Sequence, residues 1–501
     1  MTDTPPPLLA GMGPRTAAVL VFASSAAVLV VEITALRLLA PYLGLTLETS
    51  TLVIGIALAA IALGSWAGGR VADRADPHRL IAPALGASGV VVAFSPAVVR
   101  MAAEWAPPLL ILVAAAAILV PGALLSAVTP MVTKIRLSTL AETGTVVGKL
   151  SGVGTVGAIA GTVVTGFVLI SRLPVSAILV GLGVLLVAGA AVVEWRARGW
   201  VRSRAVALVA ALVAAGLAST VAPGGCDAET KYHCAQVVAD PDRDSGRTLV
   251  LDGLRHSYVD TADPTVLEFD YVRALAAAVD AAFPAGQPLS AYHLGGGGLT
   301  FPRYLAADRP GTASLVSEID GGVVDLDRDE LGGLTGTGID IRVEDGRLGL
   351  ERLESDSRDL IVGDAFGGVS VPWHLTTVEA LTDVRRVLTP DGVYVANLID
   401  HGDLAFVRAE VATVGQVFDH VAVLGEPDAL TSDPARGGNF VVVAADRPLD
   451  LQATRDALAA RALGWAVITG ADLDDWIGAA PVLTDDHAPV DQLLQPFATM
   501  P

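Results

Sequence analysis

The sequence predicts an α-helical transmembrane bundle of about seven spans, followed by a doubly wound α/β domain that begins with a small β unit. Three observations predict this division. Of the 501 residues, 52% are hydrophobic but only 5% are aromatic, a composition too apolar for an ordinary soluble enzyme. Long apolar segments end near residue 221, and short strand-like segments separated by turns follow. The charge also changes at this point.

The two halves of the chain carry opposite charge. Residues 1–223 hold 14 Lys and Arg against 8 Asp and Glu, whereas the remaining residues hold 19 against 45. An apolar half with basic loops joined to an acidic polar half is typical of a membrane domain followed by a water-exposed domain. Neither half offers a basic face, so we do not expect nucleic acid as a partner.

Seven segments of the first half are apolar and long enough to cross about 30 Å of hydrocarbon. They cover approximately residues 16–40, 50–69, 80–99, 108–132, 146–170, 174–193 and 205–221. The first is too long for a cleaved signal peptide and is followed by further spans. We therefore expect an integral membrane protein, with the lipid bilayer as a partner and a transmembrane domain over residues 1–223.

The basic residues predict the orientation of these spans, because Lys and Arg near span ends are retained on the cytoplasmic side. They cluster in the connections after the second, fourth and sixth segments, at Arg70, Arg74, Arg79, Lys134, Arg136, Lys149, Arg196, Arg198, Arg202 and Arg204. The alternate connections hold little beyond Arg100 and Arg172. With seven spans, the chain after Val221 is extracytoplasmic. One span more or fewer would reverse that placement.

The only two cysteines, Cys226 and Cys234, follow the last segment. A disulfide between them would suit an oxidising exterior, and we predict one. The spacing leaves two alternatives open: two unpaired thiols near the surface, or a partial metal site with His233. We assign no metal site from the sequence.

One ionisable residue stands within the first span. Glu32 precedes Arg37 by five residues, and a charge at membrane depth is costly unless it is paired or hydrated. Glu32 is therefore a candidate site within the bundle. The alternative is a buried ion pair, with Arg37 or another helix, that only fixes packing.

In the second half, residues 224–265 read as a linker and small β unit, and residues 266–501 as the α/β domain. Strands are expected at residues 290–294, 314–318, 339–343, 360–363, 393–397, 420–423 and 439–444, with amphipathic stretches between them. Such alternation predicts a doubly wound sheet that binds ligands at the carboxyl ends of its strands.

Four of these strand ends carry residues suited to a nucleoside. A glycine run, residues 295–298, follows the first strand and lets a ligand approach the backbone. Glu318 ends the next strand, where a carboxylate can accept both ribose hydroxyls. Asp345 and Asp364 follow the next two strands. We expect all four positions to meet in one crevice. The alternative is a chance set of solvated loop acids.

From residue 248 to 397 the sequence resembles the spermidine synthases, the polyamine aminopropyltransferases. The matching stretches are residues 251–253, 268–271, 295–297, 317–320, 344–346 and 359–364. The whole chain is similar to bacterial membrane proteins in which such a domain follows transporter-like helices. Residues 69–74 resemble a transporter loop, and residues 483–491 match the usual ending of that group.

The resemblance implies a methyltransferase-like, Rossmann-like fold that binds decarboxylated S-adenosylmethionine, or a related adenine nucleoside, and a polyamine such as putrescine. It implies that Glu318 binds the ribose, Asp345 binds the adenine amino group and Tyr271 lines the amine pocket. The residues that would lie against the nucleoside are Gly295, Gly296 and Gly297.

Three positions depart from the family pattern, and all three bear on the chemistry. The aspartate that normally ends the glycine run is Gly298, and the family's Tyr-Gln pair reads Tyr271-Val272. The aspartate that deprotonates the amine is replaced by Gly367. Asp364 or His374 could substitute as the base, since a histidine of ordinary pKa suits that role. The alternative for His374 is a helix-cap or packing residue.

Two functions remain open from the sequence. One is a divergent or weakly active membrane-bound aminopropyltransferase. The other is a non-catalytic extracytoplasmic domain on an anchoring or transporter-like bundle. The lost base and the expected exterior location favour the second, and the retained Glu318 and Asp345 favour the first.

Overall fold

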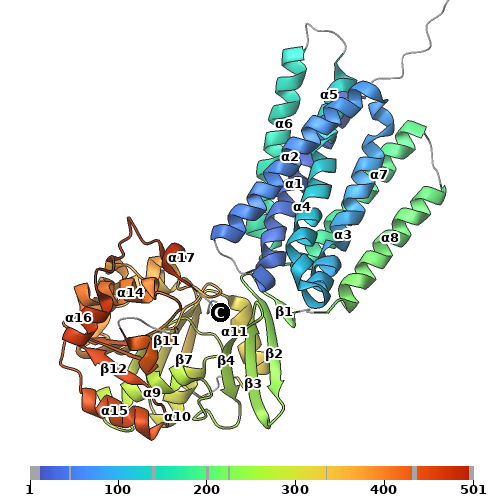
Figure 1. The fold of residues 1–501 in the computed structure, drawn as a ribbon. Coiled ribbons are helices and arrows are strands. Elements are labelled where there is room, and N and C mark those ends of the chain that lie inside the picture. The colour runs from blue at the N-terminus through green and yellow to red at the C-terminus, as the bar shows by residue number, and fades with distance from the viewer. Residues whose placement is uncertain are drawn as a thin grey trace, which may run out of the picture. The chain divides into compact units, whose positions relative to one another are not determined.

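The computed structural model describes residues 12–43, 47–137, 143–198, 202–223, 226–333, 336–431 and 437–495. The chain divides into two compact units, Met1–Lys231 and Tyr232–Pro501. The first is helical and the second is α/β (Figure 1). The division falls within the 224–265 segment, where we expect a linker and β unit. The boundaries at residues 223 and 265 stay predictions.

The first unit consists of helices that follow the predicted apolar segments. They are α1 (Pro14–Leu43), α2 (Leu47–Arg74), α3 (Ile81–Trp105), α4 (Leu110–Ser126), α5 (Val128–Arg136), α6 (Thr143–Val164), α7 (Val175–Arg198) and α8 (Arg202–Val221). Single-turn helices η1 (Pro77–Arg79) and η2 (Pro107–Leu109) precede α3 and α4, and the π-helical turn η4 (Thr165–Leu169) extends α6. Helices α4 and α5 together form the fourth predicted segment.

Six helices among the described residues are long and apolar enough to cross a membrane, rather than the seven that we predict. The seventh segment forms α8, but its described apolar part is only Ala207–Val221. At 1.5 Å per residue this part is about 22 Å long, which is shorter than the hydrocarbon layer. Arg198, Arg202 and Arg204, which we use for orientation, have side chains outside the described residues.

Close helix packing in the first unit depends on glycine. Helix α6 packs along α1, and a Cβ built on Gly157 would lie 2.4 Å from the Phe22 carbonyl oxygen. A Cβ on Gly161 would lie 2.5 Å from the Ala26 carbonyl oxygen. Only glycine allows the two backbones to approach this closely, as is common in membrane helix pairs.

One group of polar residues in this unit lies around Glu229 and Thr230. Arg100 of α3 donates to Glu229 at 2.8 Å, and their side chains are only 10% and 15% exposed. Glu229 also accepts a hydrogen bond from Ser176 at the start of α7 (3.0 Å). Arg37 donates to the Thr230 carbonyl. Within the described residues, Glu32 makes no hydrogen bond or ion pair. Its role as a membrane site stays a prediction.

Two sheets are described for the remainder of the chain. A four-stranded antiparallel sheet has the order β1 (Ala228–Glu229), β2 (Cys234–Asp240), β3 (Arg243–Leu251) and β4 (Leu254–Asp260). An eight-stranded sheet has the order β12 (Ala466–Thr469), β10 (His420–Gly425), β11 (Gly438–Ala445), β9 (Leu388–Asp400), β8 (Arg358–Gly363), β5 (Ser290–Leu294), β6 (Ala313–Glu318) and β7 (Ile339–Val343).

The eight-stranded sheet is mixed. Strands β5 to β9 pair in parallel, whereas β9–β11, β11–β10 and β10–β12 are antiparallel. Strand β5 lies between β6 and β8, so the strand order reverses beside it. This switch point is where an open α/β sheet leaves a crevice at the carboxyl ends of its strands.

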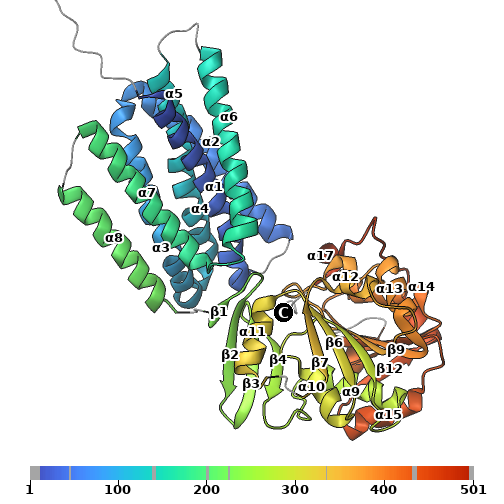
Figure 2. The ribbon, with the colours of Figure 1, turned by 180° about the vertical axis from the view of Figure 1, so that it is seen from behind.

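Helices cover both faces of this sheet (Figures 1 and 2). One face packs against α9 (Asp270–Ala282), α10 (Thr300–Asp308) and α15 (Leu451–Ala460). The other packs against α12 (Gly346–Glu351), α13 (Val378–Val387), α14 (Ala405–Val417) and α16 (Ala471–Ile477). The remaining helices are α11 (Gly321–Glu330), α17 (Val490–Leu493), η5 (Trp373–Leu375) and η6 (Pro427–Leu430).

The central strands are continuous apolar runs because both of their faces are buried. Along β8, Leu360 and Val362 enter one core cluster and Ile361 enters the other. The second unit is thus an α/β domain whose sheet is covered by helices on both faces, which confirms the α/β fold class predicted from the sequence.

Candidate active site

A cavity of about 660 Å³ lies in the second unit at the carboxyl ends of β5, β6 and β8. The residues that we predict for the nucleoside, the amine and the base all line it, namely Tyr271, Gly295, Gly296, Gly297, Glu318, Asp345, Asp364 and His374. They come from separate strand ends and from the loops that follow them. The fold therefore brings together residues that are up to about a hundred positions apart in the sequence.

The glycine run wraps around the carboxylate of Glu318. One carboxylate oxygen, Oε2, accepts hydrogen bonds from the backbone N–H groups of Gly296 (2.8 Å) and Gly297 (3.2 Å). The other, Oε1, accepts from the N–H of Asp320 (2.9 Å). Each carboxylate oxygen has two acceptor sites, so one site of Glu318, on Oε1, is left to accept a hydroxyl group from a ligand.

Gly295 is needed for this geometry. Its φ is +93°, a left-handed conformation that side chains rarely adopt. A Cβ there would lie 2.4 Å from the carbonyl oxygen of Asp364. The tight turn places the end of β5 directly against the end of β8.

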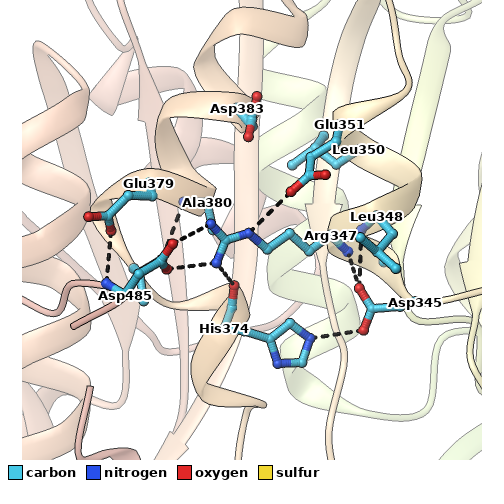
Figure 3. Close-up of polar contacts among 12 residues, drawn as sticks. Asp345, Arg347, Leu348, Leu350, Glu351, His374, Glu379, Ala380, Asp383 and Asp485 are labelled. Carbon is cyan, nitrogen blue, oxygen red and sulfur yellow. Dashed lines mark hydrogen bonds and ion pairs between the residues drawn. The ribbon is translucent and has the colours of Figure 1, made fainter. Parts of the chain in front are cut away.

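Asp345 and His374 form a pair on the cavity wall (Figure 3). Asp345 caps the N-terminus of α12, and its Oδ1 accepts from the N–H groups of Arg347 (3.0 Å) and Leu348 (3.1 Å). Its Oδ2 lies 2.9 Å from Nε2 of His374, which is in η5. His374 therefore contacts the predicted adenine-binding carboxylate, which is compatible with a structural role as much as with catalysis.

Asp364 is the carboxyl group best placed for acid–base chemistry. Its Oδ1 accepts from the Asn397 side chain at 2.9 Å, and its Oδ2 accepts a longer hydrogen bond from the Tyr271 hydroxyl at 3.4 Å. Burial raises the pKa of Asp364 to about 6, although these two hydrogen bonds oppose the shift. Burial and the nearby Asp364 also raise the pKa of Tyr271, which stays protonated.

Gly298 and Gly367, the two glycines that stand where the family pattern has aspartate, differ in the space around them. A Cβ built on Gly298 would lie 2.9 Å from the Ser257 Cβ and 3.1 Å from Val259, because this residue packs under β4. A Cβ on Gly367 would meet nothing closer than the Ser370 carbonyl oxygen at 3.9 Å. A side chain thus fits at Gly367 and not at Gly298.

Sequence reasoning missed several residues that shape this cavity. His256 of β4 lines it, and burial lowers the pKa of its imidazole to about 4. Its Nε2 is buried without a hydrogen-bond partner. Asn397 orients Asp364 and accepts in turn from Asn439 at 2.9 Å. For Asn397, the available signal was a polar side chain within an otherwise apolar stretch, because most buried polar groups have hydrogen-bond partners.

The cysteine region is also described. Neither Cys226 nor Cys234 is a free thiol in the structure. Their pairing with one another stays a prediction. His233, the alternative metal partner, lies 2.8 Å from the Asp252 carboxylate through Nδ1.

The chain is similar in sequence to one curated protein described below. No family model matches the chain. A probable polyamine aminopropyl transferase of Bifidobacterium longum (strain NCC 2705) is 27% identical over 288 residues, covering 53% of this chain and 61% of that protein. This relative is of the family that residues 248–397 resemble in sequence. The chain spans about three fifths of the length of this relative.

The chain is also similar to solved structures described as spermidine synthases. A probable spermidine synthase from Corynebacterium glutamicum ATCC 13032 shows 29% identity and a TM-score of 0.49, covering 56% of this chain and all of the other. The spermidine synthase from Thermotoga maritima shows 21% identity and a TM-score of 0.34, covering 45% of this chain and 72% of the other.

Proposed function

We propose that the C-terminal domain binds an adenine nucleoside of the S-adenosylmethionine type together with an amine, and that it is a divergent, weakly active aminopropyltransferase carried on a membrane-embedded bundle. One observation carries this proposal. The glycine run, Glu318 and Asp364 meet at one cavity, in which Asp364 has a raised pKa.

The nucleoside end of the cavity fits such a ligand. The spare acceptor site on Oε1 of Glu318 suits a ribose hydroxyl, and the glycine run leaves the backbone open to close approach. Asp345 lies on the wall beyond them, at the start of α12. Side chains at Gly296 or Gly297 would crowd Glu318 or Ser257, which explains why glycine occupies both positions.

The amine end fits only in part. The pattern of the family predicts an acidic side chain at Gly298 to hold the aminopropyl ammonium, but this position is closed by β4. Other carboxylates, Glu268, Asp270 and Asp364, line the cavity and can attract a cationic amine. Phe269 and Tyr271 add aromatic surface beside them.

Asp364 is the residue that we assign as the base. When bound, the nucleoside supplies a carbon beside a sulfonium, whose C–S bond breaks with its electron pair left on sulfur as the amine nitrogen bonds to that carbon. The amine must lose a proton, and the ionised carboxylate of Asp364 accepts it. Its pKa of about 6 leaves it mostly ionised at neutral pH.

The reaction should be slow because the usual base position is Gly367. A primary amine is mostly protonated at neutral pH, and a positioned base is typically worth about 10² to 10⁴ in rate. Asp364 accepts hydrogen bonds from Asn397 and Tyr271, and these bonds stabilise its ionised form and make it a weaker base. A non-catalytic nucleoside-binding domain is the second candidate, which the altered positions Gly298 and Gly367 favour.

Turnover separates the two candidates. The full-length protein is incubated with decarboxylated S-adenosylmethionine and putrescine, and spermidine is measured by mass spectrometry. We expect slow formation that rises with pH through about 6, as Asp364 ionises, and that Asp364→Asn abolishes. Asp356→Asn, at an exposed aspartate eight residues earlier, is the control and should not change the rate. No spermidine from the parent would leave only the non-catalytic candidate.

A further inference from the structure

Residues 483–491 have no role in the proposed chemistry, yet they contact residues beside the cavity wall. They contain a tight turn in which the backbones of Thr484 and His487 exchange hydrogen bonds of 3.1 and 2.9 Å. The backbone of buried Leu483 anchors this turn, because its carbonyl accepts from Val378 (3.0 Å) and its N–H donates to Thr413 (2.9 Å). The fold of the turn therefore does not rest on the side chains at its tip.

The tip of the turn presents Asp485 to Arg347 of α12. The two carboxylate oxygens accept from the two terminal guanidinium nitrogens at 2.7 and 2.6 Å, a bidentate pair. Thr377, at the N-cap of α13, also donates to Asp485 at 2.7 Å. The Arg347 guanidinium holds the pKa of the Asp485 carboxyl below its usual range.

Arg347 continues from this pair to the predicted nucleoside site (Figure 3). Its guanidinium donates to the carbonyl oxygen of His374 at 3.1 Å, while its backbone N–H donates to Asp345 at 3.0 Å. The ring of His374 in turn lies 2.9 Å from Asp345, so Arg347, His374 and Asp345 all contact one another. The Asp345 carboxylate contacts only Arg347, His374 and the backbone N–H of Leu348 among the described residues.

The elements that carry this pair are short. Helix α12 has six residues and η5 has three, and isolated helices of that length are not stable on their own. A planar guanidinium held at both nitrogens by a carboxylate has one orientation, and a lysine ammonium at the same place would not. The Asp485–Arg347 pair therefore supplies the rigidity that α12 and η5 lack.

We propose that Asp485 and Arg347 are positioning residues, which fix Asp345 and His374 in the geometry that holds the adenine end of the nucleoside. This inference rests on the proposed function for the identity of the ligand. It assigns to the C-terminal turn the task of completing a binding wall whose other residues precede it by more than a hundred positions.

The first test measures binding of methylthioadenosine to the full-length protein by calorimetry. Asp485→Asn keeps the shape of the side chain and removes its charge, and we expect it to weaken binding about tenfold. Asp486→Asn, at the next and exposed residue of the same turn, should bind like the parent. Asp485→Glu should restore part of the affinity. Equal weakening by both asparagine variants, or no weakening by Asp485→Asn, would refute the proposal.

The second test does not need the nucleoside. With ¹³C-labelled histidine, the ring signals of His374, assigned through His374→Gln, should move in Asp485→Asn and not in Asp486→Asn. Arg347→Lys keeps the charge but cannot form the bidentate pair with Asp485, so it should also move the His374 ring signals. Unmoved signals in both variants would refute the positioning role. If the parent binds no methylthioadenosine, the proposed function fails, and these signals still decide whether the pair positions His374.

Discussion

Asp364 and Gly367 lie three residues apart on one loop, and the proposed weak activity depends on both positions. Asp364 is half-buried, has a raised pKa and is hydrogen-bonded within the cavity wall. Gly367 has open space around it, and its neighbours Phe366 and Gly368 line the cavity. The loop therefore has room for a side chain at position 367.

Restoring that carboxylate should restore rate. We predict that Gly367→Asp increases spermidine formation by about 10- to 100-fold, somewhat less than the full value of a positioned base because the surrounding loop also differs from the family. The rate is measured by mass spectrometry with decarboxylated S-adenosylmethionine and putrescine. Gly298→Asp is the contrasting variant, because its side chain would meet Ser257 and Val259. A Gly367→Asp protein that folds but shows no gain would contradict this assignment.

At the scale of residues, the sequence predicts the site residues that lie at the ends of recognisable strands. Glu318, Asp345 and Asp364 each follow a strand that its apolar residues make recognisable, and all three line the cavity. Arg347 and Asn397 could not be predicted in the same way. Their importance depends on partners far away in the sequence, Asp485 and Asp364 respectively. Only the fold of the whole domain brings these partners together.

Helix α14 carries a carboxyl group with no evident use. Glu410 is 2% exposed, and its Oε2 is buried without a hydrogen-bond partner. Burial raises its pKa well above the usual value, and the ionisable group that faces it is Tyr394 of β9. The folded protein thus keeps this group protonated at a pH where the unfolded chain ionises it. Such a group opposes folding as the pH rises above about 4.5.

We therefore predict that Glu410→Met, of similar length and without the polar group, stabilises the protein at pH 7 by about 2 kcal/mol. The gain should be small near pH 4, where the glutamate is protonated in both states, and should grow as the pH rises. Thermal unfolding at both pH values measures it, with Glu354→Met at an exposed position as the control. An equal change at both pH values would show that the effect is packing and not ionisation.

At the scale of elements, strands flanked by turns could be predicted and the direction of the later strands could not. The strands β5 and β7 have the bounds expected from the sequence. Strand β5 is largely buried, whereas β7 is an edge strand whose sequence alternates apolar and polar residues. The short edge strand β12 was missed, since four residues give too little pattern. The antiparallel pairing of β9, β10, β11 and β12 depends on contacts between strands and leaves no local signal.

At the scale of the molecule, the number of spans and the positions of the basic residues decide on which side of the membrane the C-terminal domain lies. Among the residues that the structure describes, six helices are long and apolar enough to span a membrane, and the seventh predicted segment, α8, is shorter in its described part. If α8 also crosses, the basic connections place the C-terminal domain outside the cell. If it does not, the same rule places that domain in the cytoplasm, where nucleoside sulfonium compounds are made.

We predict the exterior location. A reporter enzyme that is active only in the cytoplasm, fused after the C-terminus, should be silent, because the basic loops are retained inside. The same reporter fused within the loop that follows α2, near Arg74, should be active. Strong activity of the C-terminal fusion would reverse the topology and would strengthen the catalytic candidate over the non-catalytic one.

The central claim is that this domain has kept the nucleoside-binding half of the family site. Calorimetry with methylthioadenosine tests it most directly. We predict binding by the full-length protein, and a loss of about 2 kcal/mol in Glu318→Ala, because charge-assisted hydrogen bonds to the ribose are removed. Glu330→Ala, at an exposed glutamate on α11, should bind like the parent. No binding by the parent, or equal binding by Glu318→Ala, would contradict the claim.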